Sequence, residues 1–148
     1  MTKLQRSALG WILFAFFFSL SAFSQSNNSS NSAAQKNAEE QKEAHAVPVL
    51  DGGIGPCTAD ITVTDANAAP VYAATVKVHI AYGFANARKL DLQLGTNVDG
   101  KARFTGLPDK IKHGFLFHAT EGDREGEAFD DPTNTCNAQL PITIRKPE

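Results

Sequence analysis

Apolar and polar residues alternate along most of the chain after residue 57, which is the pattern of half-buried β-strands. The clearest example is residues 74–82 (ATVKVHIAY), where Val76 and Val78 fall on one face and Lys77 and His79 on the other. The same alternation marks segments at residues 59–64, 90–94, 101–105, 115–119, 126–130 and 140–144. About seven short strands in roughly 90 residues, with no helical periodicity among them, predict an all-β domain built as a β-sandwich.

Turn-forming residues separate these strands. Asn97-Val98-Asp99-Gly100 lies between two alternating segments, and Asp-Gly readily supplies the positive φ of a tight hairpin. Gly106-Leu107-Pro108 is expected to end the next strand, because proline cannot donate a hydrogen bond to a strand ladder. For the same reason Pro141 predicts that the last strand lies at a sheet edge.

The N-terminal residues follow a different pattern. Residues 1–24 combine two basic residues, Lys3 and Arg6, with an apolar run over residues 8–20 and small residues around position 24. This arrangement is typical of a secretory signal peptide, and the run is shorter than the about 20 residues that span a bilayer. We therefore expect an exported protein, periplasmic or extracellular, with an uncleaved N-terminal anchor as the alternative.

Residues 25–54 are rich in Ser, Asn, Gln, Ala and charged residues. Such a segment buries too little apolar surface to offset the entropy of ordering it, so we predict a flexible tether. Residues 33–46 contain good helix formers and are expected to form a frayed helix at most, without an apolar stripe that would dock it. The folded domain is predicted over residues 55–146.

The chain has two cysteines, Cys57 and Cys136, at opposite ends of the predicted domain. In an exported protein such a pair is expected to form a disulfide. A metal pair and a catalytic thiol are the alternatives, but a zinc site requires more ligands and a nucleophilic cysteine requires a nearby histidine.

The chain carries 14 basic and 16 acidic residues, a formal net charge of −2. The basic residues are interspersed with acidic and apolar ones and form no track for a phosphate backbone, so nucleic acid is not an expected partner.

Two motifs resemble those of a known domain family. The stretch from Asp65 through Pro70 to Val76 resembles D-x-x-G-x-P-[VL]-x-x-A-x-V, and residues 96–108 (TNVDGKARFTGLP) match a T-[DN]-x-[DN]-G motif that ends in Leu-Pro almost throughout. On these residues the chain resembles the carboxypeptidase regulatory-like, or transthyretin-like, domains, which are seven-stranded Greek-key β-sandwiches common in bacterial exported proteins. The first motif departs at Ala68-Ala69, where Gly is usual. The motif positions are turn and core positions, so the resemblance implies a fold and no chemistry.

Two enzyme classes also resemble this sandwich. The transthyretin-related hydroxyisourate hydrolases carry early catalytic His and Arg residues and a Tyr-Arg-Gly-Ser ending, which this chain lacks. The intradiol ring dioxygenases hold iron with two Tyr and two His. Tyr72 and Tyr82 are the two tyrosines of the chain, but the His-x-His spacing of that class is absent.

The histidines of the predicted domain are His79, His113 and His118. His79 and His118 are expected to face outward from strands and to pair with cross-strand neighbours, so we assign no catalytic, metal-binding or cofactor-binding residue. A hollow holding either histidine within hydrogen-bond reach of a carboxylate would instead favour an enzyme.

The segment between two strands at residues 81–88 contains Tyr82, Phe84 and Arg88, a candidate partner-binding loop. We favour the alternative that the two aromatic side chains close the open end of the sandwich.

The sequence thus predicts a non-enzymatic exported module for binding or structural support at the cell envelope, without a cofactor. The expected partner is an envelope protein or a carbohydrate, and the only expected membrane contact is the N-terminal segment if it stays uncleaved. A small hydrolase or metal-dependent enzyme on the same scaffold is the alternative, and weak self-association through an edge strand is a third hypothesis.

Overall fold

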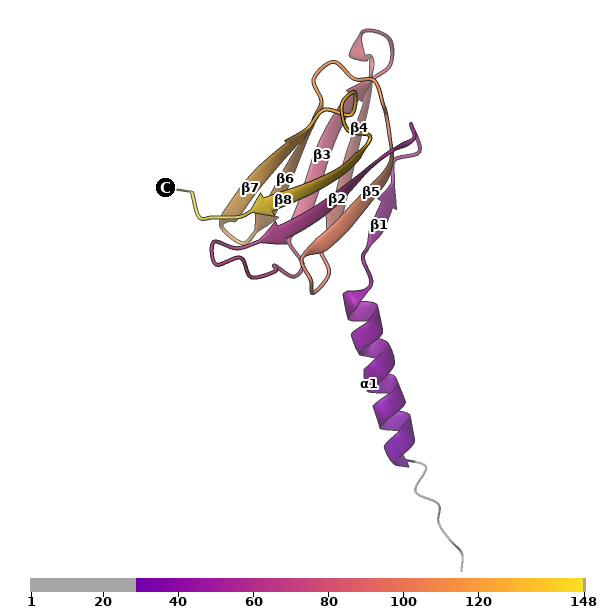
Figure 1. The fold of residues 1–148 in the computed structure, drawn as a ribbon, viewed down its shortest axis with the longest axis vertical. Coiled ribbons are helices and arrows are strands. Elements are labelled where there is room, and N and C mark those ends of the chain that lie inside the picture. Colours follow the sequence, from indigo (N-terminus) through magenta and orange to yellow (C-terminus); the bar gives the residue numbers. More distant parts are fainter. Residues whose placement is uncertain (1–28, 148) are drawn as a thin grey trace, which may run out of the picture.

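The computed structural model describes residues 29–147 and places most of them in two four-stranded sheets (Figure 1). The elements are α1 (Ser29–His45), β1 (Val49–Asp51), β2 (Cys57–Thr64), β3 (Thr75–Tyr82), the 3-10 turn η1 (Phe84–Asn86), β4 (Arg88–Gly95), β5 (Lys101–Leu107), β6 (Phe115–Glu121), β7 (Arg124–Asp130) and β8 (Asn137–Thr143). The strand order is β1-β5-β2-β8 in the first sheet and β4-β3-β6-β7 in the second. The predicted β-rich, two-sheet architecture is confirmed, with eight strands among the described residues in place of seven.

The two sheets press their apolar faces together. Alternate residues of β2 are buried along its whole length, as the sequence pattern predicts. Three phenylalanines fill the centre: the rings of Phe104 and Phe117 lie 5.6 Å apart, and those of Phe115 and Phe117 lie 6.0 Å apart. These side chains are at most 1% exposed, so the core is closed to solvent and recognition is left to the outer faces and the loops.

The additional strand, β1, lies within the segment 25–54 that we assigned to a tether. It pairs in parallel with β5, with Leu50 opposite Phe104, and the Arg103 amide donates to the Pro48 carbonyl at 2.9 Å. A strand of three residues is too short to show a period of two, so the sequence pattern could not reveal it.

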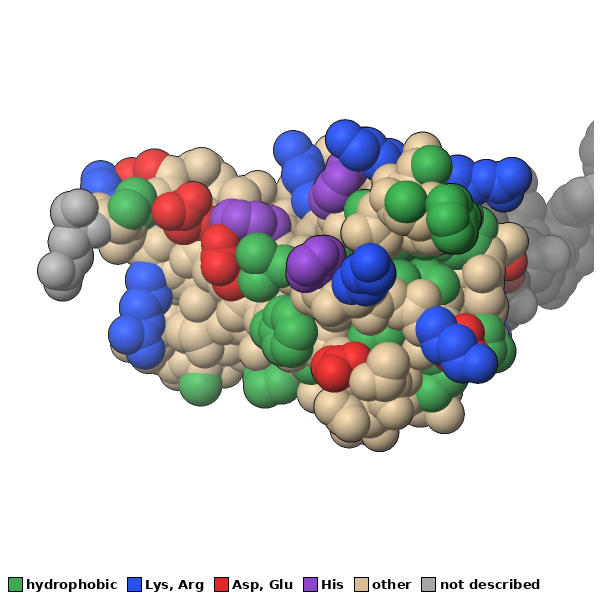
Figure 2. Space-filling model, turned by 90° about the horizontal axis from the view of Figure 1, so that it is seen from above, with side chains coloured by type: hydrophobic (Ala, Val, Ile, Leu, Met, Phe, Trp, Pro, Cys, Tyr) green, Lys and Arg blue, Asp and Glu red, His purple; other side chains and the backbone are tan. Residues whose placement is uncertain are grey.

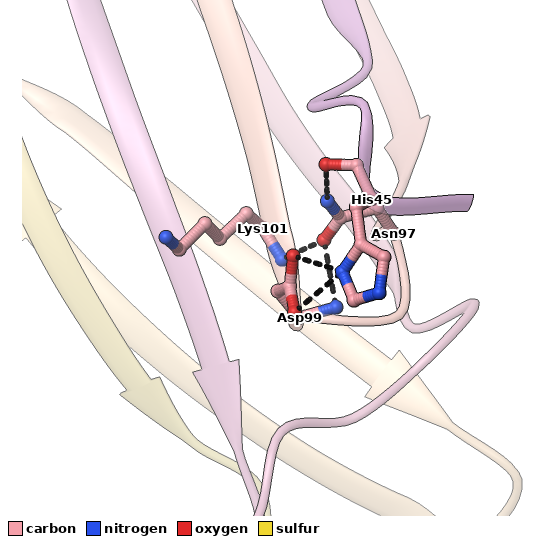
Figure 3. A network of polar contacts seen from close by, with 4 residues as sticks. All are labelled: His45, Asn97, Asp99 and Lys101. Carbon is pink, nitrogen blue, oxygen red and sulfur yellow. Dashed lines mark hydrogen bonds and ion pairs between the residues drawn. The ribbon is translucent and has the colours of Figure 1, made fainter. Parts of the chain in front are cut away.

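Helix α1 leaves the sandwich at the end opposite to η1, and its described side chains, from Lys36 onward, are exposed (Figure 1). Our expectation that nothing would dock this segment was wrong at its C-terminal end. Asn97 Nδ2 donates to the His45 carbonyl at 2.9 Å, and His45 Nδ1 lies 2.9 Å from an Asp99 carboxylate oxygen (Figure 3). Polar contacts, which leave no apolar stripe in the sequence, therefore attach the helix to the sandwich.

The turn at residues 97–100 is not the tight hairpin that we predicted, because β4 and β5 belong to different sheets. Gly100 does have a positive φ of 71°, and a Cβ there would clash with the Val63 carbonyl oxygen. Thr96, 4% exposed, accepts from the Ala74 amide at 2.9 Å and donates to the Val71 carbonyl at 2.7 Å. The Asp99-Gly100 turn thus connects a strand of one sheet to a strand of the other and forms a corner of the scaffold.

The turn after β2 holds a non-glycine residue with a positive φ. Asp65 Oδ1 accepts from the amides of Ala69 and Asn67 at 3.0 and 2.8 Å, and these hydrogen bonds lower the pKa of Asp65. Ala68 has a φ of 62°, a left-handed conformation that glycine adopts without strain. Ala68 therefore takes a conformation that is strained for a residue with a Cβ.

A disulfide joins Cys57 and Cys136, as predicted, over a sequence separation of 79. It links the start of β2 to the segment before β8, and the two strands run parallel to each other. Strand β8 lies at the edge of its sheet, as Pro141 predicts. The bridge therefore ties together the two ends of the folded domain.

The predicted signal peptide, residues 1–24, lies outside the described residues. Within residues 29–147, the structure contains no helix with the length and hydropathy needed to cross a bilayer. The disulfide is compatible with an exported protein.

Candidate functional site

The outer face of the β4-β3-β6-β7 sheet carries a broad hollow of about 890 Å³. We call it the sheet-face hollow. Its lining residues come from all four strands and from the segment before β6: Lys77, Val78, His79, Asp91, Leu92, Gln93, His113, Gly114, Leu116, His118, Thr120 and Glu125. Most of these occupy the outward positions of the period-two pattern, so the alternation that builds the core also places them on one surface.

Two histidines on this face each pair with a carboxylate. His79 Nδ1 lies 2.5 Å from Asp91 Oδ1, and His118 Nε2 lies 2.7 Å from Glu127 Oε1. In both cases the two residues are direct cross-strand partners, His79 with Asp91 and His118 with Glu127. The expected pairing of outward histidines with cross-strand neighbours is confirmed.

An exposed apolar pair lies beside these histidines. Leu116 and Phe129 are direct cross-strand partners on β6 and β7, and their side chains are 46% and 59% exposed. The Phe129 ring lies over Gly114, where a Cβ would come within 2.5 Å of Phe129 Cζ. Glycine at this position therefore lets an aromatic ring lie flat at the edge of the hollow.

Charged groups also line the hollow. Lys77 on β3 lies opposite His118 and Gln93, and Glu125 lines the hollow from β7. Asp130, at the end of β7, has a raised pKa because of its burial and, secondarily, the neighbouring charge of Asp131. Viewed from above, Figure 2 shows purple histidine side chains beside red acidic and green hydrophobic ones on the surface of the molecule.

This arrangement has limited chemical capacity. A carboxylate that orients an imidazole is half of an acid–base unit, and both histidines line the hollow. The lining residues include no Ser or Cys that would complete a nucleophilic triad, and Thr120 is the one hydroxyl among them. Across residues 29–147, no three His, Cys, Asp or Glu side chains gather in a geometry that would hold a metal ion.

The residues of the predicted partner-binding loop lie in different environments in the structure. Tyr82 is partly buried and packs against the core, whereas Phe84 is 97% exposed on η1. The Arg88 side chain is exposed and runs close to Gly83. The preferred interpretation, in which both aromatic residues close the sandwich, therefore holds for Tyr82 and is wrong for Phe84, because the turn at residues 83–86 directs that ring outward.

The sequence analysis missed Leu116 and Phe129. Both residues occupy outward positions in their strands, where a polar residue is expected on a solvated face. The signal was therefore present as two apolar residues out of phase with the core pattern. Their proximity, however, depends on the β6–β7 register.

Comparisons with known proteins identify no family. No family model and no curated protein matches the chain. Among solved structures, the chain is similar to 3-chlorocatechol 1,2-dioxygenase from Rhodococcus opacus 1CP, with a TM-score of 0.45 and 12% identity over 68% of this chain and 64% of that one. It is also similar to catechol 1,2-dioxygenase from Pseudomonas arvilla C-1, with a TM-score of 0.39 and 11% identity over 77% of this chain and 68% of that one. We transfer no residue role from either protein.

Proposed function

We propose that this protein is a non-enzymatic, exported module of the carboxypeptidase regulatory-like or transthyretin-like type, and that its sheet-face hollow binds a protein partner at the cell envelope. The observation that carries the proposal is the exposed Leu116–Phe129 pair, which lies on the same face as the His118–Glu127 pair and the polar side chains that line the hollow. An apolar centre with a polar rim is the usual composition of a protein interface.

The apolar pair supplies the affinity in this proposal. Full burial of a Leu or Phe side chain is worth about 1.5–3 kcal/mol, and these two side chains are already partly covered. A partner that covers both would gain roughly half of that per residue. The neighbouring strands are packed on the core, so the surface is rigid and little entropy is lost on binding.

The paired histidines supply specificity. Their side chains are 56% and 46% exposed, and ion pairs this exposed contribute only about 0–1 kcal/mol to stability. A partner can therefore replace Asp91 or Glu127 as the hydrogen-bonding group without weakening the fold. Such complementarity selects among partners more than it adds affinity.

Substitution of the apolar pair tests the proposal. Leu116→Ser and Phe129→Ser should each lower the affinity of the immobilised protein for a retained envelope component by roughly three- to tenfold, because each removes about half of the free energy of burying that side chain. Tyr72→Ser is the matched control, since Tyr72 is 65% exposed outside the hollow. Equal retention by all three variants, with unchanged thermal unfolding, would contradict the proposal.

Protease treatment of the envelope fraction identifies the class of partner. Loss of retention after treatment supports a protein partner, whereas undiminished retention would mean that the hollow binds a carbohydrate. Light scattering on the purified chain distinguishes a third outcome. A dimer that Leu116→Ser or Phe129→Ser dissociates would make a second copy the partner.

A small hydrolase or metal-dependent enzyme is the second candidate, and one observation favours it. The hollow does place His79 within hydrogen-bond distance of a carboxylate, the geometry that we named as favouring an enzyme. Elemental analysis of the purified protein and an ester-hydrolysis assay discriminate between the two. Stoichiometric iron or zinc, or hydrolysis abolished by His79→Ala and retained by His113→Ala, would replace the binding proposal.

A further inference from the structure

A second surface lies at the end of the molecule farthest from α1. The turn η1, the segment at residues 108–114 and the segment at residues 131–136 meet there (Figure 1). We define the apical surface as Phe84, Arg88, Lys110, Ile111 and Lys112. It shares no residue with the sheet-face hollow.

The apical surface presents its aromatic side chain on an ordered turn. Phe84 is 97% exposed, more than any other large hydrophobic residue of the described chain. The turn is closed by hydrogen bonds from the Asn86 amide to the Gly83 carbonyl at 3.2 Å and from the Ala87 amide to the Phe84 carbonyl at 3.1 Å. Ala85 and Asn86 have φ values of 53° and 57°, a conformation rare outside glycine that is often found at functional turns.

Three exposed cations lie close to the turn that carries this ring. Arg88, Lys110 and Lys112 are exposed, and none of the three takes part in any ion pair of the described chain. By contrast, Arg103, Arg124 and Lys146 all pair with carboxylates.

The two segments that meet η1 carry two acidic residues, Asp109 and Asp131, against the three cations of the apical surface. Asp131 is occupied within its own turn, where it accepts hydrogen bonds from the Thr133 amide and hydroxyl and from Asn134 Nδ2. Asp109 is the other acidic residue of the two segments that flank the turn η1. The view from above in Figure 2 shows several blue Lys and Arg side chains around green hydrophobic ones.

A groove of about 330 Å³ adjoins the turn. It lies between Tyr82, Gly83 and Asn86 on one side and residues 110–112 on the other, with Thr133 completing its lining. Two lysines line the groove, so an anionic group placed there would be held next to the turn that carries Phe84.

We propose that the apical surface binds a membrane that contains anionic lipid, with Phe84 inserted at the headgroup level and the three cations contacting lipid phosphates. A protruding aromatic ring flanked by Lys and Arg fits the boundary between headgroups and acyl chains. A protein partner of such a ring would have to provide a pocket for it, whereas a bilayer receives it without one. Helix α1 leaves the sandwich at the opposite end, so its described residues do not cover this surface.

Fluorescence at position 84 tests the proposal on the full chain. Trp11 is the sole tryptophan, so the variant Trp11→Phe/Phe84→Trp reports from the apical surface alone. Vesicles of phosphatidylcholine with phosphatidylglycerol should shift its emission to shorter wavelength. Vesicles of phosphatidylcholine alone should leave the emission unchanged.

Charge reversal provides the matched comparison. Lys110→Glu/Lys112→Glu in the same background should raise the lipid concentration needed for half the shift by about tenfold or more. Lys101→Glu/Arg145→Glu makes the same change in net charge away from both surfaces and should leave that concentration within about twofold. The N-terminal apolar segment is identical in all variants, so its own lipid binding cannot produce the difference.

Four outcomes would overturn the proposal. An emission that no vesicle shifts, or that neutral vesicles shift equally, would show that anionic lipid is not bound through Phe84. The same shift with polyglutamate would assign the surface to an acidic protein. A shift with free glycerol phosphate would assign the groove to a soluble phosphate.

Discussion

Removal of the disulfide should reduce the stability of the domain more than any other change to the covalent structure. The bridge between Cys57 and Cys136 closes a loop with a sequence separation of 79. In the chain-entropy model, a loop of about 80 residues lowers the entropy of the unfolded chain by roughly 15 cal/mol/K, or about 4.5 kcal/mol at 25 °C. Since a domain of this size is stable by only about 5–15 kcal/mol, the variant should lie near the limit of folding.

The variant Cys57→Ala/Cys136→Ala is the suitable perturbation. Cys57 is 1% exposed, so a serine there would add the cost of burying a hydroxyl group, whereas alanine removes only the sulfur. Urea unfolding followed by circular dichroism measures the effect. With a slope of about 2 kcal/mol/M, the midpoint should fall by roughly 2 M.

Reduction of the unsubstituted protein is the control, and its midpoint should fall to that of the double variant within about 0.5 M. A loss of less than about 1 kcal/mol would refute the loop-closure reasoning. Two free thiols in the unreduced exported protein would refute the pairing itself, and mass spectrometry of linked peptides detects this directly.

Three further changes test the corners of the scaffold. Asn97→Ala removes the hydrogen bond to the last residue of α1 and two bonds within its own turn, so we expect a loss of about 1–3 kcal/mol and faster amide exchange at the end of α1. Ala68→Gly should raise the unfolding free energy by up to about 1 kcal/mol because it relieves a left-handed alanine, whereas Ala66→Gly in the same turn should not. Asp130→Asn should be more stable than the unsubstituted protein at neutral pH. The raised pKa of Asp130 means that the folded state binds the proton of this carboxyl more tightly than the unfolded state does, so the stability of the unsubstituted protein falls as pH rises from about 3.8 through that pKa. Unfolding curves of the two proteins, measured from acid to neutral pH, should therefore converge below this pH range.

The sequence predicted the strands well because each one has a buried face. Alternation in segments such as residues 74–82 is imposed by the core, and the bridge between Cys57 and Cys136 was predicted from the expectation that the chain is exported. Strand β1 was not predicted because a strand of three residues is too short to show the alternation of apolar and polar positions. The pairing of the strands could not be predicted either, because the Asp99-Gly100 turn is compatible with both a hairpin and a crossing between sheets.

The candidate surfaces were harder to predict because they depend on register and on turn geometry. The outward position of His79 and His118 could be read from alternation, but their specific carboxylates depend on the pairing of β3 with β4 and of β6 with β7. The exposure of Phe84 depends on the backbone at residues 83–86, where a non-glycine residue takes a positive φ. Neither feature leaves a periodic signal.

Site-specific photo-crosslinking in intact cells tests the binding proposal most directly. A photoreactive residue would replace Gln93 in the sheet-face hollow or, as the matched control, Gln139 on the exposed face of the other sheet. The proposal predicts one discrete protein adduct from position 93, lost when Leu116→Ser is added, and none from position 139. No adduct from position 93, or equal adducts from both positions, would contradict it.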